Sequence, residues 1–393
     1  MRRKDTVTLE IDGEKYEFFT SISISSELNT TARNATVELT GTLPTGQMFL
    51  QKFTVGQSVR VYVADELMLT GYITATPFSY TATDFNATIA VQSRTIDIVQ
   101  CSPMKAGQTI GRIKTGKNIV RPSQNTALCF RNQTSRQIVA DLIAPYGAGL
   151  VVEDSSVLTD KRSYDVDPNK TVLSNLKDII NSDDLWLCDD EEGNLVVTGK
   201  ASEVSGTISL GKEIKSGNAR FDGSHLFSEW EVIGQSSGKG SKGGKSINCA
   251  NGSATLNFSR PRYKAIKNDS QCTDSKTQTQ ANGECQLAQS DFRTVQYTVQ
   301  GWRDGNGNLW KINRLVTVDD SFLFSDRIDM LIKSVTFNLS NEGGMTTVLD
   351  IAPPDGMKSG NASPTKTAGG SKGKFKDTKS SDAGIYLNPI KEQ

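Results

Sequence analysis

The chain of 393 residues is long enough for two or three domains, each with a core of its own. Its 44 basic and 44 acidic residues cancel, so no large single-sign field is expected, which argues against nucleic acid as the main ligand. The 34 glycines and the many Ser, Thr, Asn and Gln residues are typical of a β-rich protein with many turns.

The N-terminus is basic, but it lacks the apolar segment that would follow in a signal peptide. No apolar run in the sequence approaches the length of a membrane span. We therefore expect a chain that is made and first folded in a cytoplasm, without stable membrane binding.

The first hundred residues alternate apolar and polar side chains, the pattern of half-buried strands. A hairpin turn is predicted at Asp12-Gly13, where a positive φ has a low steric cost. An antiparallel meander with one apolar face follows over Val59–Arg94, with its first turn at Asp65-Glu66. We predict a tube-like β-barrel domain over residues 1–102.

Residues 103–200 have helical as well as strand patterns, and they predict a smaller α/β domain with a linker. Thr134 can cap a helix whose apolar residues have helical spacing, and Pro145 and Gly147 end it. Thr171 or Ser174 can cap a second helix. A hairpin then follows, with an acidic turn at residues 189–194.

Three segments resemble binding motifs without satisfying them. Residues 111–118 nearly fit a phosphate-binding loop, but Asn118 stands where Ser or Thr is needed, so a basic surface loop is predicted. The acidic turn at residues 189–192 is either a cation site or, the interpretation we favour, solvated. Residues 304–308 begin like a calcium-binding loop, but Leu309 and Leu315 replace the required Gly and Glu, which favours a tight turn.

The sequence contains no recognisable catalytic or metal-binding constellation. His225 is the only histidine, which excludes a site with two histidine ligands, and no nucleophile-elbow or zinc-protease motif is present. The six cysteines form no C-x-x-C pair, although Cys272 and Cys285 could form a disulfide. We predict no catalytic residues, no cofactor and no metal.

Residues 201–352 contain a second meander that is similar to the first. Val316 and Val318 precede a turn, a long strand runs to Leu339, and residues 346–351 close the set. Residues 274–292 are either a polar helix or an extended connector. The two meanders predict two copies of one β-domain, and hence an assembly component with internal pseudo-symmetry.

Several short stretches resemble the baseplate hub proteins of contractile-tailed phages, the Mu-like tail P and late-control D families. In the second half these are Gly301-Trp302, Leu309-Trp310 and the run from Asn313 to Val318. In the first half they are Gly71-Tyr72-Ile73 and the course from Arg94 to Cys101, in which Asp97 lies one place earlier than in the family pattern. The resemblance covers residues 1 to about 352.

This resemblance implies a mainly β fold in which two tube-like antiparallel β-barrel domains flank the α/β domain. It implies a structural homotrimer at the centre of a virion baseplate, whose pseudo-sixfold ring joins the hexameric tail tube to the trimeric central spike. Other baseplate proteins would also bind it. DNA would pass only transiently through its channel during genome ejection, and assembly would take place in the cytoplasm of the host bacterium.

Other interpretations remain open. The chain could belong to a type VI-like or tailocin injection machine, or it could be a tail-associated cell-wall hydrolase or a carbohydrate-binding β-protein using Trp302 and Trp310. Residues 353–393 have the composition of a flexible tail, which is either simply disordered or a tethered docking peptide. The partner-docking residues of that peptide would be Tyr386, Leu387, Pro389 and Ile390.

Overall fold

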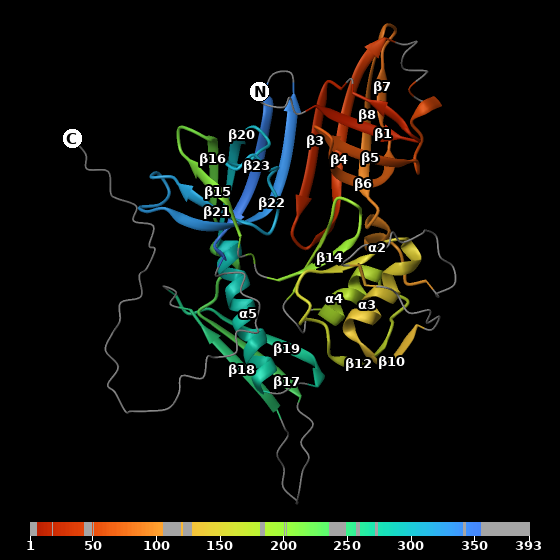
Figure 1. Cartoon of the computed structure of the whole chain (residues 1–393). Helices are drawn as coiled ribbons and strands as arrows, with labels where there is room; N and C mark the ends of the chain where they lie inside the picture. Colours follow the sequence, from red (N-terminus) through yellow and green to blue (C-terminus); the bar gives the residue numbers. More distant parts are fainter. Residues whose placement is uncertain are drawn as a thin grey trace, which may run out of the picture.

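In the computed structural model, the described residues are 6–17, 19–42, 49, 51–104, 119–120, 128–180, 185–199, 201, 203–235, 249–256, 260–271, 274–340 and 343–354. Two β-modules lie side by side, and the α/β domain and a further small unit lie at one end of them (Figure 1). The chain is mainly β with a smaller α/β part, as predicted. None of the helices in the described ranges is long and apolar enough to cross a membrane.

The first module is an antiparallel sheet built from the N-terminal alternating segments. Its strands are β1 (Val7–Ile11), β2 (Glu14–Tyr16), β3 (Ser21–Glu27), β4 (Thr30–Thr42), β5 (Ser58–Val63), β6 (Glu66–Ala75), β7 (Phe78–Tyr80) and β8 (Asp84–Ser93). The hairpin turn at Asp12-Gly13 is confirmed, with φ of 52° and 86°. The first turn of the Val59–Arg94 meander lies at Ala64-Asp65, one residue earlier than predicted, because these two residues adopt the positive φ that a tight hairpin requires.

The α/β domain follows the first module. It contains α2 (Ile96–Gln100), β9 (Ile119–Val120), β10 (Cys129–Thr134), α3 (Ser135–Ile143), η1 (Ala144–Tyr146), β11 (Leu150–Val152), β12 (Lys161–Asp165), α4 (Val172–Ile180), β13 (Trp186–Asp189) and β14 (Leu195–Thr198). The predicted cap is confirmed, since the Thr134 hydroxyl accepts a hydrogen bond from the Gln137 N–H. Gly147 then ends the helical segment with a positive φ of 71°.

The second module begins after the α/β domain. Its strands are β15 (Val204–Ser209), β16 (Ile214–Phe221), β20 (Arg293–Gln300), β21 (Leu315–Asp319), β22 (Ile328–Ser340) and β23 (Gly344–Ala352). A separate unit interrupts it between β16 and β20, comprising η3 (Gly223–His225), β17 (Glu229–Gln235), β18 (Cys249–Thr255), β19 (Tyr263–Gln271) and α5 (Asp274–Phe292). Of the two structures predicted for residues 274–292, the helix is the one present, as α5. It packs so closely on β18 that a Cβ on Gly252 would lie 2.2 Å from the backbone of Thr277.

The two modules have the same topology. In the first, the strands lie in the order β3-β4-β8-β6-β5, and in the second in the order β16-β20-β23-β22-β21. If each set is numbered along the chain, both orders read first, second, fifth, fourth, third. The prediction of two copies of one β-domain is therefore confirmed at the level of strand order.

A shared β-bulge fixes how the two modules correspond residue by residue. The pairing of β6 with β8 shifts between Ile73 and Ala75, and the pairing of β22 with β23 shifts between Ile332 and Ser334. Counting on from these bulges, β7 corresponds to the last part of β22, and Phe78 corresponds to Phe337. Strand β7 is thus the continuation of β6 after a break at residues 76–77.

The two modules share one sheet and one core. Strand β3 pairs with β22, which joins them into a single path from β16 to β2, and the pairings among the described strands do not close either half into a barrel. Apolar side chains from both modules meet in one buried cluster, which includes Ile22, Ile24, Val37, Val59, Val61, Ile89, Tyr297, Val316, Val335, Phe337, Leu349 and Ile351. Burial of this common face is the main source of stability for the fold.

Candidate assembly surfaces and the buried ion cluster

The junction between the modules is an antiparallel ladder of backbone pairs. It runs from Ser334 opposite Glu27 to Ser340 opposite Ser21, and its centre is the pair of Phe337 with Ile24. On the core side, Phe337 is only 2% exposed. The modules are therefore held in a fixed relation by backbone hydrogen bonds as well as by apolar packing.

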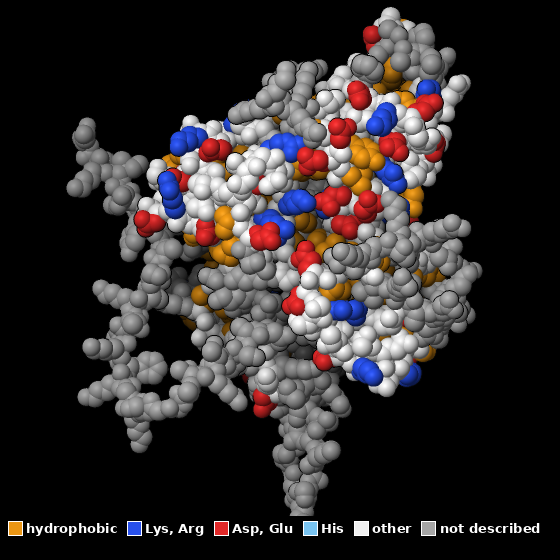
Figure 2. Space-filling model, viewed as in Figure 1, with side chains coloured by type: hydrophobic (Ala, Val, Ile, Leu, Met, Phe, Trp, Pro, Cys, Tyr) orange, Lys and Arg blue, Asp and Glu red, His pale blue; other side chains and the backbone are white. Residues whose placement is uncertain are grey.

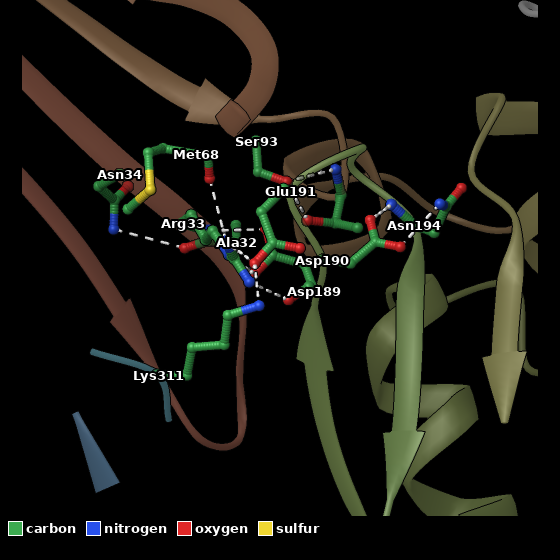
Figure 3. Close-up of polar contacts among 11 residues, drawn as sticks. Ala32, Arg33, Asn34, Met68, Ser93, Asp189, Asp190, Glu191, Asn194 and Lys311 are labelled. Atoms are coloured by element: carbon green, nitrogen blue, oxygen red, sulfur yellow. Dashed lines mark hydrogen bonds and ion pairs between the residues drawn. The ribbon is translucent and has the colours of Figure 1, made fainter. Parts of the chain in front are cut away.

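A buried arginine joins the first module to the α/β domain (Figure 3). Arg33 on β4 donates from Nε to the Asp189 carboxylate at 3.2 Å and from Nη2 to the Asp189 backbone carbonyl at 2.8 Å. Its Nη1 donates to the carbonyl of Met68 at 3.0 Å, and its backbone N–H donates to the Asp189 carboxylate at 3.1 Å. The side chains of Arg33 and Asp189 are 11% and 1% exposed, so these charges depend on each other for stabilisation.

Glu191 extends this cluster to the second module. It lies 3.3 Å from Nη1 of Arg33 and 3.7 Å from Nζ of Lys311, so one carboxylate joins two modules through the α/β domain. Burial alone would raise the pKa of Glu191, but attraction from the two cations outweighs burial and lowers it. For Asp189 burial prevails and raises the pKa, although Arg33 opposes it. In the space-filling view, acidic and basic side chains gather where the three parts meet (Figure 2).

Further hydrogen bonds hold the β13–β14 hairpin between the modules. Asn29, in the β3–β4 turn, donates its backbone N–H to the carbonyl of Leu187 at 2.9 Å. On the other side, the Asn313 side chain donates to the Thr198 hydroxyl at 2.7 Å. Gly193, at the tip of the hairpin, has a φ of 75° and packs against β6, where a Cβ would lie 2.9 Å from the Thr70 carbonyl. The hairpin is thus bonded to both modules.

A cleft of about 480 Å³ opens beside the ion cluster. Its lining includes Arg33, Glu66, Glu191, Lys311 and Arg314. Small-molecule sites are mostly apolar with a few polar groups, whereas this lining is rich in paired charges. The cleft therefore belongs to the contact between domains.

The middle of the large sheet's face opposite the core is polar and uncharged, and the rows on either side of it carry the acidic residues Glu38, Asp350 and Glu27. Two adjacent rows of side chains cross six strands of both modules in register. They are Thr298, Val348, Thr336, Ser25, Asn34 and Gln92 in the first row, and Gln300, Thr346, Asn338, Ser23, Thr36 and Ala90 in the second. Neither row contains a charged residue, although charged residues make up 22% of the sequence.

Among the strands with an unpaired edge in the described part of the chain, β16 and β7 lie beside the two polar rows. Strand β16 pairs only with β20, and β7 pairs only with β8. Phe78 and Tyr80 on β7 are 44% and 70% exposed, and their rings stack with centroids 6.0 Å apart. Because unpaired edges are templates for another strand, these two are candidate contacts with other chains.

Three family models match successive parts of the sequence. The N-terminal domain of Mu phage baseplate assembly protein GpP-like proteins matches residues 6–95, the second domain of baseplate hub protein gp44-like proteins matches residues 118–199, and the fourth domain of GpP matches residues 273–360. The three matches follow the first module, the α/β domain and the second module. The chain belongs to the Mu-type baseplate hub family.

Similarity to individual proteins supports this family membership. Baseplate hub protein gp44 of Escherichia phage Mu is 27% identical over 364 residues, which span 90% of this chain and 89% of gp44. The 43 kDa tail protein of prophage MuSo2 from Shewanella oneidensis has a similar fold, with a TM-score of 0.73 at 24% identity over 90% of this chain and all of that one. A tail protein from Neisseria meningitidis has a TM-score of 0.70 at 18% identity over 89% of this chain and 98% of its own.

The structure also decides several of the motif predictions for this hub chain. The acidic turn is not merely solvated, because Asp189 binds Arg33 and Glu191 binds both Arg33 and Lys311. These side-chain cations pair with the two carboxylates that a metal ion would have used. Residues 304–308 form the predicted tight turn, in which the Asp304 N–H donates to the Asn308 carbonyl at 2.7 Å. His225 lies exposed in the short helix η3.

Other predictions fall partly or wholly outside the described residues. These are the loop at residues 111–118 and the docking residues Tyr386, Leu387, Pro389 and Ile390. Cys285 is a buried free thiol, and Cys272 is not among the described residues. Within the described ranges, no three His, Cys, Asp or Glu side chains are arranged to hold a metal ion.

Arg33 is the most important residue that the sequence did not reveal. It stands in an alternating strand where an outward-facing arginine is ordinary, and its partner Asp189 is 156 residues away. The acidic turn was the one signal, because its carboxylates can be paired by a cation as well as by water.

Proposed function

We propose that this baseplate hub acts as a homotrimeric ring that joins the hexameric tail tube to the trimeric central spike of a contractile tail. The repeated module is the observation that carries this proposal. Two modules of one topology, joined edge to edge through β3 and β22, present six similar units when three chains close into a ring. A structural role of this kind requires no catalytic group.

The connections at the two ends of the modules differ, which supports a role as an adaptor between a sixfold and a threefold partner. At one end, β3 and β4 are joined by a turn of two residues, whereas the equivalent β16 and β20 are separated by the β17–β19 and α5 unit (Figure 1). At the opposite end, the β7–β8 and β22–β23 connections are short in both modules. In the proposed ring, the end with the β7–β8 and β22–β23 turns presents six similar turns and faces the tube. The end with the β17–β19 and α5 unit has only threefold symmetry and faces the spike.

The two uncharged rows of this sheet face, flanked by acidic residues, support a channel through which DNA passes without being held. Double-stranded DNA binds proteins chiefly through Lys and Arg contacts to its phosphates, and the two polar rows offer neither. We infer that this face lines the channel, and that the virion baseplate, with its tube, spike and neighbouring proteins, is where the chain acts.

Adding positive charge to this face should slow DNA release from assembled particles. Particles carrying Ser25→Lys with Thr336→Lys in the hub should release DNA about tenfold more slowly at low salt, and added salt should restore the rate, because lysine–phosphate contacts are screened. The measurement is the rate at which a DNA-binding dye reports release after triggering. Particles with Ser25→Gln and Thr336→Gln serve as the control, and equal rates in both would contradict a channel at this face.

The mass of the purified chain in solution tests the ring itself. Light scattering over a range of concentrations should give three times the chain mass of 42.7 kDa, and a complex with the spike protein should keep three hub chains. A chain that stays monomeric with and without its spike protein, or that forms a ring of another number, would overturn the proposal.

A further inference from the structure

We propose that the cleft beside the ion cluster binds a lysine-rich segment of the same chain, residues 372–376. This segment has the sequence Lys-Gly-Lys-Phe-Lys and belongs to the C-terminal residues 355–393, which lie outside the described part of the chain. The cleft and the segment are parts of one chain, so the inference does not depend on the proposed ring.

The lining of the cleft has more acidic than basic residues. Its carboxylates are those of Glu66, Glu153, Asp189, Asp190, Glu191 and Glu192, and its cations are those of Arg33, Lys311 and Arg314. Outside the lining, Arg303 pairs with Glu66 at 2.8 Å. Glu203 pairs with Arg314 at 3.2 Å, so these outer partners leave the acidic excess unchanged. A cleft with this excess attracts a positively charged segment.

Two of these carboxylates accept hydrogen bonds from neutral groups. Glu153 accepts one from the Thr198 hydroxyl. Asp190 accepts two from Asn194, one from its backbone N–H and one from its side-chain Nδ2, both at 2.8 Å (Figure 3). Burial raises the pKa of Asp190, so a neighbouring cation would stabilise its charged form. The ammonium group of a lysine is such a cation.

Two other residues of the lining each carry a buried polar atom that has no hydrogen-bond partner among the described residues. These atoms are Nε1 of Trp310, a donor, and Oδ1 of Asn313, an acceptor. Trp310 is 4% exposed and Asn313 is 9% exposed, and buried polar groups of this kind normally have a partner. A peptide group offers both a carbonyl and an N–H, whereas a metal ion can satisfy only the Asn313 oxygen. The two atoms therefore favour a peptide as the occupant.

The segment matches the cleft in its side chains as well as in its charge. Successive side chains of an extended peptide point to opposite sides, so the three lysines lie on one side and Phe375 lies on the other. The lining likewise combines its carboxylates with the apolar side chains of Met68, Leu309 and Trp310. The other lysine-rich stretch, residues 236–246, contains no apolar side chain. Residues 372–376 are therefore the better match.

The chain leaves the second module close to the cleft. Ala352, the last residue of β23, lies opposite Leu331 on β22, and Leu331 lies opposite Leu315 on β21. Asn313, in the lining, precedes Leu315 by two residues. Two strand spacings, about 10 Å, thus separate the end of β23 from this side of the cleft. Residues 353–371 can span roughly 60 Å when extended, and a tether of this kind makes even a weak contact form often.

Photo-cross-linking of the purified full-length chain tests this inference. Phe375 is replaced by the photo-reactive residue p-benzoylphenylalanine, the chain is irradiated, and mass spectrometry locates the linked peptides. The expected links are to residues 66–68 and 309–314 of the same chain, so the product should run as a monomer on a denaturing gel. Raising the salt concentration from about 50 mM to about 500 mM should reduce the yield, because salt screens the attraction.

Matched variants of the cleft show whether its charge is responsible. Glu153→Gln/Asp190→Asn should lower the yield of these links about fivefold, the effect of losing two exposed ion pairs. Asp165→Asn/Asp178→Asn removes two exposed carboxylates of the same α/β domain that are not part of the lining, and it should leave the yield unchanged.

A variant of the segment tests the same charges without altering the cleft. Lys372→Gln/Lys374→Gln/Lys376→Gln should lower the yield at least as much as the change of the two carboxylates. The inference is wrong if the links are spread over other surfaces, if they form only between chains, or if the lysine variant cross-links as well as the unaltered segment.

Discussion

Replacing Arg33 with methionine should lower the free energy of unfolding by about 3–5 kcal/mol, the range for removing one partner of a buried ion pair. The substitution removes the donor that satisfies the Asp189 carboxylate and backbone carbonyl, and it leaves Glu191 with Lys311 alone. Because burial already raises the pKa of Asp189, the carboxyl group would take up a proton or draw in water. The measurement is urea denaturation at one fixed protein concentration, followed by tryptophan fluorescence.

Arg60 provides the matched control. It pairs with Glu10 at 3.9 Å on the surface of the first module, so Arg60→Met should cost no more than about 1 kcal/mol. The double variant Arg33→Met/Asp189→Asn should recover part of the loss, since it removes the unpaired charge. Equal midpoints for Arg33→Met and Arg60→Met would show that the cluster does not hold the domains together.

Gly71→Ala should destabilise the first module by about 3 kcal/mol or more, at the upper end of what overpacking costs. A Cβ on Gly71 would lie 1.8 Å from the carbonyl oxygen of Gln92 and 2.8 Å from the Cα of Ser93. Both are backbone atoms, so no change of rotamer relieves the overlap, and β6 must separate from β8. Thermal unfolding, followed by circular dichroism, should show the loss.

Gly199→Ala is the control for this substitution. No atom lies within 4 Å of the position that its Cβ would take, so its stability should stay within about 0.5 kcal/mol of the unaltered chain. A Gly71→Ala chain as stable as the Gly199→Ala chain would mean that β6 and β8 leave room for a methyl group at residue 71.

The alternating pattern was sufficient to predict most of the β-structure. Val59, Val61 and Val63 are fully buried on one face of β5, and their counterparts Val316 and Val318 are fully buried on β21. A period of two residues survives wherever one face meets a core and the other meets solvent, so both meanders could be found.

Other features could not be predicted from such a pattern. The contact of β3 with β22 is made by strand edges, and edges leave no trace in the alternation of side chains. Strand β18, with the sequence CANGSAT, contains too few apolar residues to indicate a strand, and α5 covers it at Gly252. The binding of Arg33 to Asp189 depends on two segments whose proximity only the fold decides.

The long separation between β3 and β22 has a consequence for synthesis. Strand β3 ends at Glu27, but its partner residues begin to be made only at Ser334. At roughly 5–20 residues per second, a ribosome needs on the order of 15–60 s to cover that distance. During this time the β3 edge of the nascent chain has no partner. Chaperones, or other nascent chains on the same mRNA, can bind to this edge.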